Sequence, residues 1–228
     1  AESEIRTWRG AEGLAADVRA YGEWMRDEAE KRIGHLYPKA TMSDGTQAPV
    51  VAWIWARTVT CPNPACGIQM PLVRSWWLGK KKGKEAYVVP SVVNGEVHFD
   101  IGHDITLAPG TAAGMADGTI SGRKGATCVG CGTAVEMKYI RAAAQAGNLG
   151  AQLMATVAEG SRRRVYLAPS DRDREASGVE RPSDLPDGAL PLHSPSPNSA
   201  QTITIYGFRN YVDLFTSRQL TALTTFSD

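Results

Sequence analysis

The sequence lacks any apolar run long enough to cross a bilayer, and it has only four cysteines in 228 residues. Its longest apolar runs, such as Val50–Ala56, are far shorter than the roughly 20 residues that a membrane-spanning helix needs. The first residues, AESEIRTW, are acidic and polar and do not resemble a signal peptide. We therefore expect no membrane partner and a cytoplasmic location, where cysteines stay reduced and are more often metal ligands than disulfides.

Sequence signatures of catalysis are also missing. There is no glycine-rich dinucleotide loop, no phosphate-binding loop and no Gly-x-Ser-x-Gly nucleophile elbow. The Asn/Asp-Pro-Pro-aromatic motif by which amino-methylating enzymes grip an extruded base is absent as well. The sequence therefore predicts that this chain is not an enzyme on its own, and a stand-alone enzyme with an unrecognised site stays open as an alternative.

Charge of one sign does not dominate the chain, whose formal net charge is +1. Residues 51–167 nevertheless contain 13 Lys and Arg against 7 Asp and Glu, whereas residues 1–50 contain 7 against 9. The middle of the chain is thus mildly basic, which permits a nucleic-acid partner without requiring one.

Apolar residues at steps of three and four predict a helix between Gly10 and Gly34, with Gly34 as a C-cap. The residues of this stripe are Leu14, Val18, Tyr21, Met25, Ala29 and Ile33. Because they share one helix face, we expect the stripe to pack against a core. Near the other end of the chain, Thr216 and Gln219 have the spacing of a capping box and predict the start of a second helix.

Segments rich in β-branched and aromatic residues predict strands. They are residues 50–60, 69–78, 85–93, 133–138, 151–159, 163–167 and 202–206. The Asn94-Gly95 pair is a two-residue hairpin signal, and the proline-rich residues 170–200 predict an extended connector. We therefore divide the chain into an N-terminal helical segment (1–48), a β domain (49–168), a linker (169–201) and a strand–helix segment (202–228).

Two close cysteine pairs are the strongest chemical signal. The pairs are Cys61/Cys66, with C-x4-C spacing, and Cys128/Cys131, with C-x2-C spacing. A glycine follows each pair, Gly67 and Gly132, where a tight knuckle needs positive φ or close backbone approach. Two such knuckles provide four thiolates, the ligand set of a closed structural Zn²⁺ site. The predicted fold class is α+β, with an N-terminal helix, an antiparallel β zinc ribbon holding a long insertion (74–127), and a C-terminal strand and helix.

Other interpretations of the cysteines remain open at this point. A rubredoxin-like iron centre uses the same four ligands, and Cys128/Cys131 has the spacing of a redox dithiol. The cysteines could also be unliganded or form disulfides. His98 and His103 are further candidates to replace a thiolate, although both are expected to be ordinary surface histidines.

Basic and aromatic residues are clustered between and after the cysteine pairs. The candidate nucleic-acid-binding residues are Arg74, Trp76, Trp77, Lys80, Lys81, Lys82, Lys84, Arg123, Lys124, Arg162, Arg163 and Arg164. Lysines in a turn after a strand are suited to phosphate contacts. Trp76 and Trp77 are adjacent on a predicted strand, so only one of them can face the core. The alternative is a solvated loop beside a core tryptophan, in a zinc-stabilised interaction module without nucleic-acid contact.

Several stretches resemble the adenine-specific DNA methylases that contain an internal zinc ribbon. These are residues 61–90, beginning CPNPACG, residues 125–135, residues 139–169, and residues 211–228, which include LFTSRQL. Residues 10–39 are similar to the helix that leads into that ribbon. The resemblance covers most of the chain.

The resemblance implies an internal segment of an S-adenosylmethionine-dependent DNA adenine methyltransferase. The cofactor motif would lie upstream and the catalytic motif downstream, so S-adenosylmethionine would bind only in the parent enzyme. This segment would bind Zn²⁺ and contribute DNA binding or target recognition, with DNA and the rest of the parent as its partners. Such a parent would act in restriction–modification or phage defence.

Overall fold

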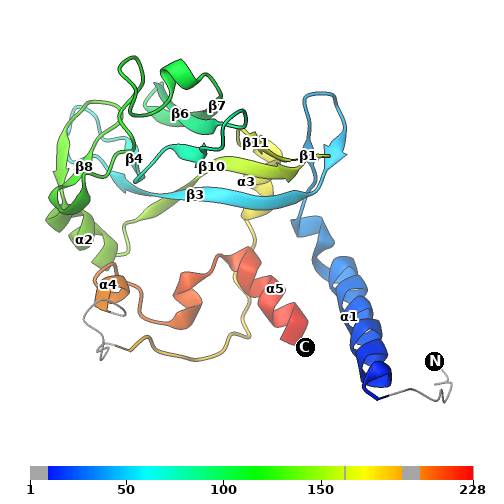
Figure 1. Cartoon of the computed structure of the whole chain (residues 1–228). Coiled ribbons are helices and arrows are strands. Elements are labelled where there is room, and N and C mark those ends of the chain that lie inside the picture. The colour runs from blue at the N-terminus through cyan, green and yellow to red at the C-terminus, as the bar shows by residue number, and fades with distance from the viewer. Residues whose placement is uncertain (1–9, 162, 192–200, 228) are drawn as a thin grey trace.

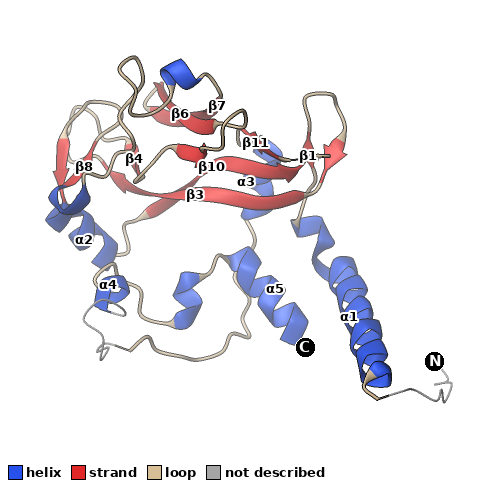
Figure 2. Ribbon diagram, in the orientation of Figure 1, coloured by secondary structure: helices blue, strands red, loops and turns tan. Residues whose placement is uncertain are grey.

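The α+β fold predicted from the sequence is confirmed by the structure, a computed structural model that describes residues 10–161, 163–191 and 201–227. A long helix stands at the N-terminal side, antiparallel sheets form the body, and a helix ends the chain (Figures 1 and 2). In the described part of the chain, no helix is both long and apolar enough to span a membrane.

The strands form four small antiparallel sheets. The largest has the order β11-β10-β3-β4, formed by Arg164–Leu167, Gly150–Glu159, Val50–Thr60 and Gln69–Leu72. A second has the order β5-β6-β7, formed by Trp77–Gly79, Ala86–Val93 and Glu96–Gly102. Two-stranded sheets pair β1 (Ala40–Thr41) with β2 (Gln47–Ala48), and β8 (Gly125–Thr127) with β9 (Ala134–Glu136). The β6–β7 turn is the predicted hairpin, with φ of 52° at Asn94 and 80° at Gly95.

Five α-helices and four short 3-10 helices complete the described residues. The α-helices are α1 (Glu12–Ile33), α2 (Met137–Gln145), α3 (Asp171–Ser177), α4 (Gln201–Thr204) and α5 (Ser217–Ser227). The 3-10 helices are η1 (Gly34–Leu36), η2 (Ile105–Leu107), η3 (Gly122–Lys124) and η4 (Tyr211–Leu214). The predicted capping box is present before α5, since Thr216 N–H donates to Gln219 Oε1 and Gln219 N–H to Thr216 Oγ1.

One hydrophobic core joins the large sheet to the inserted one. Met70 of β4 is fully buried and belongs to the same cluster as Val88 of β6 and Phe99 of β7. The same cluster includes Cys61 and Cys128. The long insertion between the cysteine pairs therefore packs as part of the body that holds both pairs.

The strand predicted for residues 69–78 is wrong as a single element. It is split into β4 and β5, which belong to different sheets. The break follows Val73, whose N–H donates to Thr119 Oγ1 and whose carbonyl accepts from Thr119 and Ile120. A segment distant in sequence thus occupies the hydrogen-bonding groups that would continue the strand, and local β-propensity does not report this.

Two predictions in the C-terminal third are also wrong. The connector predicted to be extended contains α3, which begins with a capping box between Ser170 and Asp173. The strand predicted for residues 202–206 is replaced by α4 and a turn, in which Tyr206 N–H donates to the carbonyl of Ile203. A β-rich sequence forms a strand only where a neighbouring strand can pair with it, and here the neighbour is the end of α2, where Gln145 Nε2 donates to the Ile205 carbonyl.

The N-terminal helix forms as predicted, with Gly34 as its C-cap, but its stripe does not pack against the core. Ala29 is buried, whereas Leu14 and Tyr21 each remain 69% exposed and Val18 63%. Figure 1 shows the reason, since α1 extends away from the sheets and lies beside α5. The periodicity therefore predicted the helix correctly and its burial wrongly.

A buried polar network connects α5 and α3 to strand β3 of the large sheet. The Arg218 guanidinium of α5 lies 3.8 Å from the centre of the Trp53 ring and donates to the Leu36 carbonyl. The Trp53 indole N–H donates to Asp173 of α3 at 2.8 Å. Both Arg218 and Asp173 are buried, so three elements that are distant in sequence depend on one another here.

Candidate metal centre

The structure brings the four cysteine sulfurs together into one cluster. Their Sγ atoms all lie within 4.8 Å of one another. Two contacts join one pair to the other, at 3.7 Å between Cys61 and Cys131 and 3.9 Å between Cys66 and Cys128. Four ligands at a Zn–S bond length of about 2.3 Å on a tetrahedron would be about 3.8 Å apart. The sulfurs therefore already have the spacing of a tetrathiolate metal site.

The first knuckle closes the turn between β3 and β4. Cys61 N–H donates to the Ile68 carbonyl at 2.8 Å, and both Cys66 and Gly67 donate to the Asn63 carbonyl. Gly67 has a φ of 59°, a value at which a side chain would be strained. The predicted need for glycine after this pair is thus confirmed.

The second knuckle repeats this arrangement between β8 and β9. Cys128 N–H donates to the Thr133 carbonyl at 2.9 Å, and Gly132 N–H donates to the Cys128 carbonyl at 2.9 Å. Gly132 has a φ of 73°. Two hairpin turns of the same type thus direct their sulfurs to one point from opposite sides.

Two polar residues that the sequence analysis did not single out support the exposed thiol. Asn63 Nδ2 lies 3.7 Å from Cys131 Sγ and donates to Thr133 Oγ1. Thr133 Oγ1 is itself 3.1 Å from Cys131 Sγ. Asn63 belongs to the first knuckle, so it links the two knuckles directly. Its position between two prolines in CPNPAC is the only signal of this role in the sequence.

The thiols have opposite electrostatic environments in the absence of a metal. Burial raises the pKa of Cys61 to about 12, whereas hydrogen bonds from the Thr133 hydroxyl and backbone lower the pKa of Cys131 to about 6. Four thiolates at this spacing repel one another, so all four ionise only when a cation shares their charge. The cluster thus fits a metal ion better than it fits free thiolates.

The structure does not favour disulfide bonds, a redox dithiol or histidine ligands as alternative interpretations of the cysteines. All four are free, and sulfur separations of 3.7 Å or more are too long for a disulfide bond, which is about 2.05 Å. Cys128 and Cys131 lie in a hairpin turn and not at a helix N-terminus, the usual position of a redox dithiol. His98 and His103 are outside the cluster, and His103 Nδ1 lies 2.8 Å from the Glu85 carbonyl oxygen.

Neither of the predicted aromatic contact residues presents a free ring. Trp76 is 3% exposed and packs against Phe99, which makes its predicted role in nucleic-acid contact wrong. Trp77 is half-buried, donates its indole N–H to the Pro109 carbonyl and meets the Tyr87 ring edge-on. Its other neighbour is Lys80, whose Nζ lies 5.3 Å from the ring centre.

Two of the predicted basic segments meet in space. Lys80, Lys81, Lys82 and Lys84 are exposed in the β5–β6 turn, and Arg163 and Arg164 are exposed at the start of β11. Tyr166 of β11 donates its hydroxyl to the Leu78 carbonyl of β5 at 3.0 Å. This contact is within two residues of Arg164 on one side and of Lys80 on the other.

The remaining predicted basic residues are placed elsewhere. Arg74 is exposed and lies beside Gly118, where a Cβ would come within 2.5 Å of the Arg74 backbone. Lys124 is exposed in η3, which also contains Arg123. Arg162 lies outside the described residues.

Comparison with known proteins gives no match of any kind. No family model matches the sequence, and no curated protein or solved structure does so either. The metal cluster and the surface must therefore be interpreted from their own chemistry.

Proposed function

We propose that the four cysteines bind one Zn²⁺ ion in a structural role. The support is the tetrahedral spacing of the four sulfurs. The sulfurs come from two knuckles that are distant in sequence, since Cys66 and Cys128 are 62 residues apart and Cys61 and Cys131 are 70 residues apart. With four thiolate ligands the metal has no open coordination position, so the site stabilises the fold and does no chemistry.

We further propose that the chain contacts DNA through two groups of cations. One is the basic loop, which consists of Lys80, Lys81, Lys82 and Lys84. The other consists of Arg163 and Arg164. The observation that carries this proposal is that these cations are exposed and form no ion pair within the described part of the chain. Exposed, unpaired cations on two neighbouring segments are suited to phosphate oxygens. Trp76 is buried, so we do not include it in this proposed DNA-binding surface.

The parent activity that we propose is DNA adenine methylation. Its support is the resemblance of residues 61–90 and 211–228 to methylases with an internal zinc ribbon, together with the basic surface. In this proposal the segment holds duplex DNA while other parts of the parent bind S-adenosylmethionine and methylate an extruded adenine. Restriction or phage defence would be the setting of that parent.

Salt dependence tests the DNA proposal. For about four phosphate contacts, we expect the duplex affinity of the chain to fall by on the order of 100-fold between 50 and 200 mM salt. Replacing Lys81, Lys82 and Lys84 by Gln should make the slope of log affinity against log salt shallower by about 2 to 3. The measurement is fluorescence anisotropy with a labelled duplex.

A matched control removes three cations elsewhere. Changing Arg19, Arg26 and Lys31 of α1 to Gln alters the net charge equally but leaves the basic loop intact. We expect this control to bind DNA with the wild-type slope. A flat salt response in the wild type, or equal losses in both triple variants, would rule out a dedicated DNA surface on the loop.

The exposed stripe of α1 favours a second candidate function, that of an interaction module. Leu14, Val18, Tyr21 and Trp24 are each more than half exposed along one long helix. Apolar residues so arranged are typical of a surface that docks against another protein surface. In this candidate function, zinc organises the sheets and α1 attaches them to a partner.

A pair of variants separates the two candidates. Leu14→Glu with Val18→Glu should abolish docking of α1 while leaving the DNA salt slope unchanged. The Lys81, Lys82 and Lys84 variant should make the DNA salt slope shallower while leaving docking of α1 unchanged. Co-purification with the flanking parts of the parent, expressed in the same cells, measures docking, and retention of the α1 variant by those parts would exclude this candidate.

A further inference from the structure

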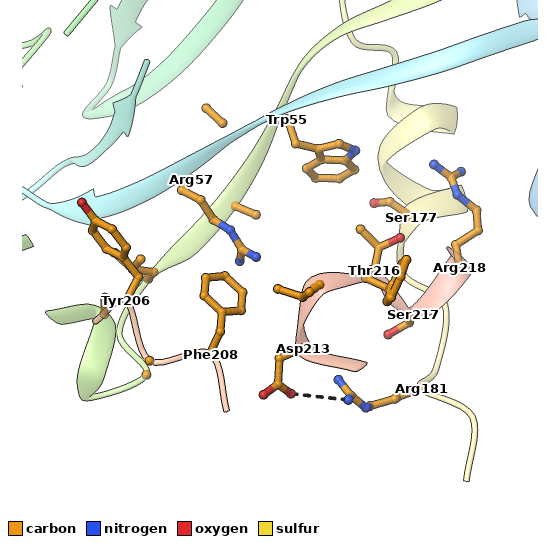
Figure 3. A pocket seen from close by; sticks show the side chains of 18 residues that line it. Trp55, Arg57, Ser177, Arg181, Tyr206, Phe208, Asp213, Thr216, Ser217 and Arg218 are labelled. Carbon is orange, nitrogen blue, oxygen red and sulfur yellow. Dashed lines mark ion pairs between the residues drawn. The ribbon is translucent and has the colours of Figure 1, made fainter. Parts of the chain in front are cut away.

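A cavity of about 630 Å³ lies below strand β3 of the large sheet (Figure 3), and none of the four cysteines lines it. Its walls come from β3, from the end of α2 and the turn to β10, from Ser177 and Arg181, and from the C-terminal segment between Tyr206 and Arg218. Its volume is in the range of cavities that bind small molecules. No motif in the sequence marks it, and neither proposed function uses it.

One side of the cavity combines aromatic faces with a cation. Trp55 and Arg57 alternate along β3, so both project from the same face of the strand toward the cavity (Figure 3). The Arg57 guanidinium carbon lies 5.3 Å from the centre of the Phe208 ring. Arg57 is exposed and forms no ion pair with any carboxylate of the described residues. Its charge is therefore available to an anion.

The opposite side presents a fixed carboxylate. Asp213 accepts hydrogen bonds from the backbone N–H groups of Asn210, at 2.9 Å, and of Arg209, at 3.0 Å. These bonds hold the pKa of Asp213 below its ordinary value. The Arg181 guanidinium lies 3.7 Å from the same carboxylate (Figure 3). This side therefore offers both a hydrogen-bond acceptor, Asp213, and a guanidinium donor, Arg181.

The wall between these two sides is held in place by the backbone. Gly207 has a φ of 82°, and a Cβ there would lie 2.4 Å from the Ala144 carbonyl oxygen. Leu190 N–H donates to the Arg209 carbonyl at 2.7 Å, and Tyr211 N–H donates to the Gly188 carbonyl at 2.9 Å. The cavity is thus preformed, which lowers the ordering cost of binding.

We propose that this cavity binds a nucleotide, with its base against Phe208 and Trp55 and its phosphate at Arg57. Aromatic side chains stack on the face of any base, and a guanidinium is the side chain best suited to phosphate oxygens. Asp213 accepts hydrogen bonds from the sugar hydroxyls or an exocyclic amine.

This nucleotide site is independent of the basic loop, so each can fail without the other. The ligand is either a free mononucleotide or one nucleotide of a single strand, and the chemistry of recognition is the same. Tighter binding of a six-nucleotide single strand than of a mononucleotide would identify the strand as the source. Equal affinity would identify the free nucleotide.

Calorimetry with AMP, adenosine and ribose 5-phosphate tests the assignment. We expect AMP to bind at least about tenfold more tightly than either fragment, because only AMP uses both the stacking and the phosphate contacts. Arg57→Gln should weaken AMP binding to the level of adenosine and leave adenosine unchanged. Phe208→Leu, which keeps an apolar side chain but removes the ring, should weaken AMP and adenosine alike by about tenfold.

Arg19→Gln on α1 is the matched control and should bind AMP as the wild type does. Arg57 is exposed, so its variant should keep the wild-type melting temperature even if Phe208→Leu does not fold. Absence of AMP binding at millimolar concentration would overturn the proposal. So would equal affinities for AMP and adenosine in the wild type, or unchanged AMP binding by Arg57→Gln.

Discussion

Removal of the metal is expected to lower the melting temperature of the chain by about 10–20 °C. Structural zinc contributes roughly 10–16 kcal/mol in isolated zinc-finger peptides. A chain with a large core of its own depends on the metal for a smaller share, on the order of 5 kcal/mol, and each kcal/mol corresponds to about 2–4 °C at this size. Scanning calorimetry before and after chelation, followed by re-addition of zinc, measures the effect.

The loss should be local in origin and specific to the sulfurs. Hydrogen exchange should increase first at the knuckle amides, such as those of Gly67 and Gly132, whose hydrogen bonds hold the two turns closed. Cys66→Ser should reproduce the chelated state, whereas Ala65→Ser, one residue away and exposed, should melt as the wild type does. Elemental analysis showing iron, or no metal in a protein of unchanged stability, would contradict the zinc assignment.

The cysteine cluster was the part of the structure most open to prediction from sequence. Each knuckle is a local feature, because a short cysteine spacing followed by Gly67 or Gly132 determines the turn by itself. Convergence of the two knuckles then follows from chemistry, since one cation needs four thiolates. The 74–127 insertion left this inference intact because its strands joined the common core.

Features that depend on contacts between distant segments were not predictable in the same way. The hydrogen bonds of Thr119 to Val73 end β4, although residues 69–78 were predicted as a single strand. The periodicity of α1 specifies a helix face but not whether anything covers it. The Asn63 side-chain amide contacts Cys131 only because the second knuckle lies beside the first. These features are set by tertiary context, which overrides local preference.

The cavity with Arg57 and Phe208 depends most strongly on contacts between segments that are distant in sequence. Its walls come from a strand, a helix–strand turn, Ser177 and Arg181, and a C-terminal segment of which only the first residue, Tyr206, was predicted to be β. None of these segments carries a nucleotide motif. Only the fold places the guanidinium over the ring, so sequence analysis had no signal with which to find the site.

The buried network around Trp53 leads to the second large effect. Asp173 accepts from the Trp53 indole at 2.8 Å and from the Ser170 hydroxyl at 2.6 Å, and it faces the buried charge of Arg218. Removing a charged acceptor leaves buried donors without partners. We therefore expect Asp173→Ala to lower the free energy of unfolding by about 3 kcal/mol. Urea unfolding at pH 7 measures this.

Asp171→Ala is the matched control, because Asp171 lies in the same first turn of α3 but is exposed, as is its partner Arg174. It should cost less than about 1 kcal/mol. Equal losses from the two substitutions would mean that the helix terminus, and not the buried network, stabilises this region.

The network also predicts how stability depends on pH. Burial opposes ionisation of Asp173, but its hydrogen bonds from Ser170 and Trp53 outweigh burial and hold its pKa below the ordinary value of 3.8. A carboxyl with a lowered folded-state pKa contributes stability above its unfolded pKa and loses it as the pH falls through the folded value. The difference between wild type and Asp173→Asn should therefore stay constant from pH 7 to pH 5 and shrink below about pH 4. A difference that is instead constant down to pH 2 would show that Asp173 acts through packing and not through its charge.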